Sequence, residues 1–111
     1  MPLPANFTGV PQVQLSNHFR NTCLEFKKNL RSTKDINKLE LEMDRFINVC
    51  REMNWNHKNS EAYHKDEGEK AVNKVVKQFR RYMTNLQADP ENATPQDVIE
   101  ALSDVESLKV G

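Results

Sequence analysis

The clearest helical pattern in the chain is INKLELEMDRFINVCREM, residues 36–53. Its apolar residues recur at alternating steps of three and four, a spacing that places them on one face of an α-helix. They are Ile36, Leu39, Met43, Phe46, Cys50 and Met53. The seam continues for about two and a half heptads. We therefore predict an amphipathic helix that ends near Met53 and buries this face against other helices.

The preceding segment repeats the helical pattern over residues 12–31. Its inward face consists of Leu15, Phe19, Thr22, Cys23, Phe26 and Leu30. Between the two segments stands Ser-Thr-Lys-Asp, residues 32–35. Ser32 or Thr33 can act as an N-cap with Asp35 in the first turn, since short polar side chains accept hydrogen bonds from exposed helix N–H groups. These residues predict a tight connection between two antiparallel helices.

Two more helices follow a polar segment near residues 54–60. The third is predicted to begin with Ser60 as its N-cap. Its inward face consists of Val72, Val75, Val76, Phe79, Met83 and Leu86. A loop at residues 87–92 separates it from the fourth helix, for which Thr94 is the expected N-cap, Pro95 the first residue and Asp97 a first-turn acid. The inward face of the fourth helix consists of Val98, Ala101, Leu102, Val105 and Leu108.

Short loops between helices favour antiparallel neighbours. We therefore predict an all-α fold, an antiparallel, up-and-down four-helix bundle over residues 14–111. Residues 1–13 contain three prolines and one glycine, and they predict an extended N-terminal arm. A chain of 111 residues is long enough for one such domain.

Composition restricts the class of protein. Lys plus Arg and Asp plus Glu are both 16, so the formal net charge is zero and no whole-chain field attracts nucleic acid or anionic lipid. Hydrophobic residues are 37%, charged residues 29% and the mean hydropathy is −0.80, which argues against a membrane protein. The first residues lack a basic cluster followed by an apolar run, so a cytoplasmic location is expected.

Cys23 and Cys50 are expected to be free thiols. In a hairpin that turns near Ser32, the two residues are staggered by about 12 Å along the helices, whereas a disulfide requires Cα atoms within about 7 Å. Both fall on inward faces, as reduced core cysteines of an intracellular protein do.

No catalytic or metal-binding motif is complete. Glu61 and His64 have the E-x-x-H spacing of di-iron bundles, but a second such pair is absent. His57 shares a helical face with these two residues, yet it lies in an Asn-rich segment. A zinc site would have to gather Cys23, Cys50, His18 and His57 from separate segments. We therefore expect no enzyme activity, no cofactor and no metal.

The third helix carries a line of cations, which we name the basic stripe: Lys70, Lys74, Lys77 and Arg81. Arg80 stands beside it, and residues 70–82 contain no acid. Residues 87–111, in contrast, carry six acids and one lysine, a net charge of −5. Two interpretations stay open. The stripe binds an anionic partner, or it is a solvated face, in part paired to the acidic fourth helix.

Some apolar residues fall outside the inward faces, among them Leu24, Leu41 and Trp55. They are ordinary exposed side chains or part of a contact surface. Together with the absence of catalytic motifs, they favour a non-enzymatic protein-binding module: an adaptor, a chaperone-like protein or a regulator of another protein. The expected partner is a protein with an acidic or mixed surface, and a homo-oligomer is also considered. The alternative is a nucleic-acid-binding protein that uses the basic face of the third helix.

Overall fold

The computed structural model describes the backbone of residues 12–52 and 62–107. In these ranges the chain forms helices α1 (Gln12–Ser32), α2 (Ile36–Glu52), α3 (Ala62–Ala88) and α4 (Gln96–Glu106). Their ends agree with the predicted segments to within about two residues, the scatter normal for helix ends. The predicted arm lies outside the described residues, apart from its last two positions, which are the first residues of α1.

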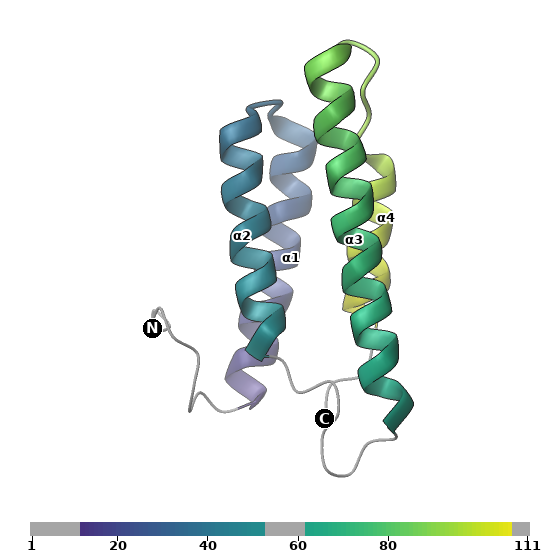
Figure 1. Cartoon of the computed structure of the whole chain (residues 1–111). Helices are drawn as coiled ribbons and strands as arrows, with labels where there is room; N and C mark the ends of the chain where they lie inside the picture. Colours follow the sequence, from purple (N-terminus) through teal and green to yellow (C-terminus); the bar gives the residue numbers. More distant parts are fainter. Residues whose placement is uncertain (1–11, 53–61, 108–111) are drawn as a thin grey trace.

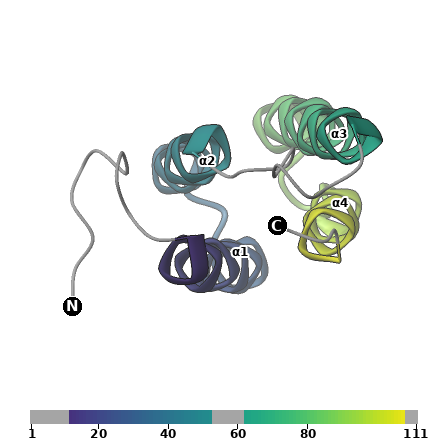
Figure 2. The ribbon, with the colours of Figure 1, turned by 90° about the horizontal axis from the view of Figure 1, so that it is seen from below.

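The helices alternate in direction and form two hairpins, α1 with α2 and α3 with α4 (Figure 1). Seen along its axis, the bundle has α2 and α3 on one side and α1 and α4 on the other (Figure 2). Contact is most extensive within each hairpin, intermediate between α1 and α4, and least between α2 and α3. The predicted all-α, up-and-down four-helix bundle is confirmed.

The cap of α2 differs from the prediction, which placed it at Ser32 or Thr33. Asp35 caps the helix: its Oδ1 accepts hydrogen bonds from the N–H groups of Asn37 at 3.1 Å and Lys38 at 3.3 Å. A carboxylate suits this position because it meets the positive end of the helix dipole. Thr33 supports the turn instead, since its Oγ1 accepts from the N–H of Asp35 at 3.1 Å.

The start of α4 lies one residue later than predicted: Pro95, expected to be the first helical residue after a Thr94 cap, is itself the N-cap. The helix begins at Gln96, one residue after Pro95. Thr94 Oγ1 accepts from the N–H of Gln96 at 3.4 Å, a long bond, and the carbonyl of Pro95 accepts from Ile99 at 3.0 Å. Asp97 stands in the first turn as expected. The proposed Ser60 cap of α3 lies outside the described residues.

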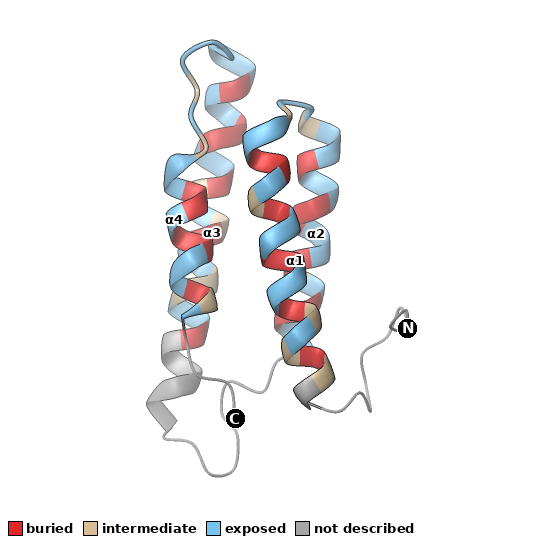
Figure 3. Cartoon of the chain, turned by 180° about the vertical axis from the view of Figure 1, so that it is seen from behind, coloured by how far each residue is buried: buried red, intermediate tan, exposed pale blue. Residues whose placement is uncertain are grey.

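Aromatic rings at the centre of the bundle join the hairpins. The ring centroid of Phe26 on α1 lies 6.2 Å from that of Phe46 on α2 and 5.8 Å from that of Phe79 on α3. Phe19 lies 6.3 Å from Phe46. All four side chains are buried, on the inward faces that Figure 3 shows in red. Burial of this area, rather than helix propensity, supplies most of the stability of such helices.

Polar contacts reinforce two helix pairs. Between α1 and α2, Asn29 Nδ2 donates to Glu42 Oε1 at 3.0 Å, and both residues are buried. The Nη1 atom of Arg45 lies 3.4 Å from the same oxygen. Between α1 and α4, Lys27 Nζ lies 2.7 Å from the solvent-inaccessible Glu106 Oε1. The bonds from Asn29 and Arg45 satisfy the buried Glu42 Oε1, whereas Lys27 offsets the charge of Glu106 Oε1, which accepts no hydrogen bond from the described residues.

Cys23 and Cys50 are both buried and free, as predicted. Burial raises the pKa of Cys23 to about 12; the negative charge of Glu106 raises this pKa as well, and Lys27 opposes the effect. Burial also raises the pKa of Cys50, and Cys23 adds to that increase. Both groups are therefore neutral thiols at physiological pH, with little nucleophilic character.

Candidate functional site: the outer face of α3 and the groove between α2 and α3

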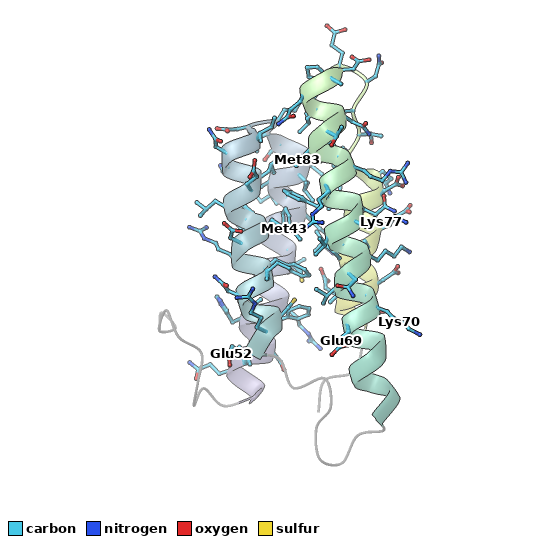
Figure 4. The ribbon with its side chains drawn as sticks, viewed as in Figure 1. Met43, Glu52, Glu69, Lys70, Lys77 and Met83 are labelled. Atoms are coloured by element: carbon cyan, nitrogen blue, oxygen red, sulfur yellow. The ribbon has the colours of Figure 1, made fainter. Side chains whose placement is uncertain are left out.

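The basic stripe lies on the solvent side of α3, where all four side chains are exposed. Figure 4 shows Lys70 and Lys77 on the side of α3 away from α2. Lys74 forms an ion pair with Asp104 of α4, with Nζ 3.4 Å from Oδ2. Within the described part of the chain, Lys70, Lys77 and Arg81 form no ion pair.

The acidic C-terminal segment neutralises little of this stripe. The side chains of Lys74 and Asp104 are 57% and 61% exposed, and pairs of this kind contribute at most about 1 kcal/mol because water screens them. Glu106, another α4 acid, is engaged with Lys27 of α1. Pairing with α4 therefore accounts for one of the four stripe residues, and three remain available to an anionic partner.

Arg80 is separated from the basic stripe. It stands at the edge of a groove of about 720 Å³ between α2 and α3. The groove has an apolar floor, and its edges carry Glu40 and Asp44 from α2 and Arg80 and Thr84 from α3. Figure 4 shows two floor residues, Met43 and Met83, between the two helices. The floor residues are Met43, Ile47, Val76, Phe79 and Met83.

The groove exists because α2 and α3 make the least contact of the neighbouring helices. Phe79 fills the base, while Ile47 and Val76 remain only partly buried. Sequence reasoning missed this feature because Ile47 lies outside the three-four seam of α2. Its position directly after Phe46 widens the apolar face toward α3, and that widening is the signal that could have revealed it.

The other candidate contact residues do not join these surfaces. Leu41 is 52% exposed and Leu24 56% exposed, and neither lines the groove. Their exposure agrees with both interpretations of these residues, as ordinary surface side chains or as part of a contact surface, and the contact role of Leu41 stays a prediction. Trp55 lies outside the described residues.

The metal-binding candidates are only partly described. Glu61 and His57 lie outside the described residues, as does the side chain of His64. Cys23 and Cys50 are enclosed in the core, and His18 is partly buried on α1, where burial lowers its pKa below 6.5. In the part of the chain that the structure describes, no three His, Cys, Asp or Glu side chains are grouped as a metal ion requires.

None of the helices within the described ranges combines the length and apolar character of a membrane span. Comparisons of the chain with protein-family models, with curated proteins and with solved structures found no match. The functional argument therefore depends on the surfaces described above.

Proposed function

We propose that this protein is a non-enzymatic protein-binding module, which acts in the cytoplasm as an adaptor or as a regulator of another protein. It engages an acidic surface of that protein through the basic stripe. The observation that carries the proposal is the solvent-facing position of Lys70, Lys77 and Arg81, none of which forms an ion pair within the described residues. The stripe extends over 11 residue steps, about 16 Å of helix.

Electrostatics favours this partner class over nucleic acid. Clustered cations steer an acidic protein during encounter and help to exclude wrong partners. A nucleic acid carries a dense and uniform negative charge, which would meet Asp104 beside the stripe, and the chain as a whole carries no net positive charge. Two free thiols fit a reducing compartment such as the cytoplasm.

Capture from a cell extract tests the proposal with two charge-matched variants. The first, Lys70→Glu/Lys77→Glu/Arg81→Glu, reverses the unpaired cations of the stripe. The second reverses three exposed cations of α1 and α2, Arg20→Glu/Lys28→Glu/Lys38→Glu. We expect the wild type and the second variant to retain the same proteins from the extract. The first variant should lose them. Equal retention by all three proteins would show that the stripe is only a solvated face.

Nucleic-acid binding is tested directly with a 20-base-pair DNA duplex. We expect negligible binding at about 0.15 M salt, where screening acts beyond about 8 Å. If Lys70, Lys77 and Arg81 instead grip phosphates, the logarithm of the affinity should fall with the logarithm of salt concentration at a slope near −3. Micromolar binding at about 0.15 M salt that disappears in the stripe variant would replace the proposal with the nucleic-acid function.

A further inference from the structure

The groove between α2 and α3 has a partly accessible apolar floor and charged edges of opposite sign. We infer that a second copy of this chain docks in it, so that the α3 edge of each copy lies against the α2 edge of the other. This inference is independent of the proposed function, because the groove shares no residue with the basic stripe.

Part of the floor of the groove is accessible to a partner, whereas Met43, Phe79 and Met83 are buried. Ile47 and Val76 pack against the core but keep part of their surface accessible. Met43 and Met83 flank them, and methionine adapts its shape to a contacting surface.

The edges of the groove make the surface complementary to itself. The α2 edge carries two acids, Glu40 and Asp44, and the α3 edge carries the cation Arg80. Within one copy, neither acid forms an ion pair with Arg80 among the described residues. All three charges therefore remain available to a partner surface of opposite pattern.

Symmetry decides how two copies meet. A dimer interface of this kind uses the same patch on both copies, related by a two-fold axis. An axis parallel to the helices through the centre of the groove brings Glu40 and Asp44 of one copy to Arg80 of the other, twice over. An axis across the helices at the same point would bring the two acidic α2 edges together, which like-charge repulsion opposes.

Sedimentation equilibrium of the full chain is the first test. We expect a species of about twice the 12.9 kDa chain mass at micromolar concentration. Glu25→Arg, a charge reversal on an exposed residue of α1 away from the groove, should leave the association unchanged. A chain that stays monomeric up to millimolar concentration would overturn the inference.

A mixing experiment then tests the symmetry. Glu40→Arg/Asp44→Arg and Arg80→Asp should each weaken self-association about tenfold or more, because each variant meets like charge across the axis. An equimolar mixture of the two should regain wild-type affinity, because opposite charges meet again at both contacts. Circular dichroism of each variant shows that the bundle remains folded.

Other occupants of the groove give different results. Dimers that neither variant weakens would place the contact elsewhere and overturn the inference. A monomeric full chain that dimerises after removal of residues 1–11 would assign the groove to the N-terminal segment of the chain itself. A monomer that retains a partner protein through Asp44 and Arg80 would assign it to that partner. Neither of these last two outcomes would affect the proposed function of the basic stripe.

Discussion

At the scale of single residues, the aromatic side chains have the largest energetic role. Phe46 is fully buried, and its ring neighbours Phe19 and Phe26 belong to α1. Phe79 comes from the other hairpin and is 6% exposed. Removal of such a ring loses its transfer free energy and leaves a cavity that the surrounding helices only partly close.

We expect Phe46→Ala and Phe79→Ala each to lower the free energy of unfolding by about 3 to 5 kcal/mol. That loss is a large part of the roughly 5 to 15 kcal/mol typical of a domain. Urea titration followed by far-ultraviolet circular dichroism measures the change, with Leu41→Ala as an exposed control. A loss below about 1 kcal/mol at both phenylalanines would contradict the core described here.

The two cysteines give a chemical prediction. Burial raises the pKa of Cys23 from 9.0 to about 12. The fraction of Cys23 present as thiolate at pH 8 is therefore about a thousandfold lower than that of an ordinary cysteine. Cys50 changes in the same direction. We expect a chromogenic disulfide reagent at pH 8 to react slowly with the native protein and rapidly with two thiols after unfolding. Fast reaction of the folded protein would show that the thiols are exposed.

At the scale of elements, the loop between α1 and α2 depends on one carboxylate. Asp35→Ala removes both hydrogen bonds that Asp35 Oδ1 accepts at the start of α2. We expect a loss of about 1 kcal/mol in unfolding free energy, the usual cost of an N-cap. Thermal unfolding measures it against Glu25→Ala, an exposed acid in the middle of α1. Equal stability of the two variants would mean that Asp35 is not the cap.

The ion pair between α3 and α4 is predicted to matter little for stability. Lys74 and Asp104 are both largely exposed, so Lys74→Ala should change the free energy of unfolding by less than about 1 kcal/mol. Lys77→Ala, which removes an unpaired cation of the same stripe, is the matched control. A loss of several kcal/mol at Lys74 alone would show that the pair joins the helices and is not a solvated contact.

At the scale of the whole molecule, the two hairpins are expected to unfold together. Phe26 joins them, because its ring lies against Phe46 in one hairpin and Phe79 in the other. The wild type should therefore show one cooperative transition, with far- and near-ultraviolet circular dichroism giving the same midpoint. Phe26→Ala should lower that midpoint strongly. Separate transitions in the wild type would mean that each hairpin is stable alone.

Periodicity in the sequence was enough to predict the helices and their inward faces. Steps of three and four residues place side chains on one side of a helix whatever lies opposite, so Phe46 and Phe79 could be assigned to the core. Local turn chemistry predicted connections at residues 32–35 and 87–92, and the structure has them at residues 33–35 and 89–95. Turn chemistry did not identify the capping residue, since Ser32, Thr33 and Asp35 are all competent caps and only the backbone path selects Asp35.

Which neighbour each helical face meets depends on the packing of the whole bundle. Periodicity gives the direction of a side chain relative to its own helix, but not the distance to the next helix, which depends on how the two hairpins pack. The predicted cations of α3 consequently divide: Lys74 reaches Asp104, Arg80 borders the groove, and the rest of the stripe faces solvent. The groove arises in the same way, because α1 and α4 pack more closely than α2 and α3.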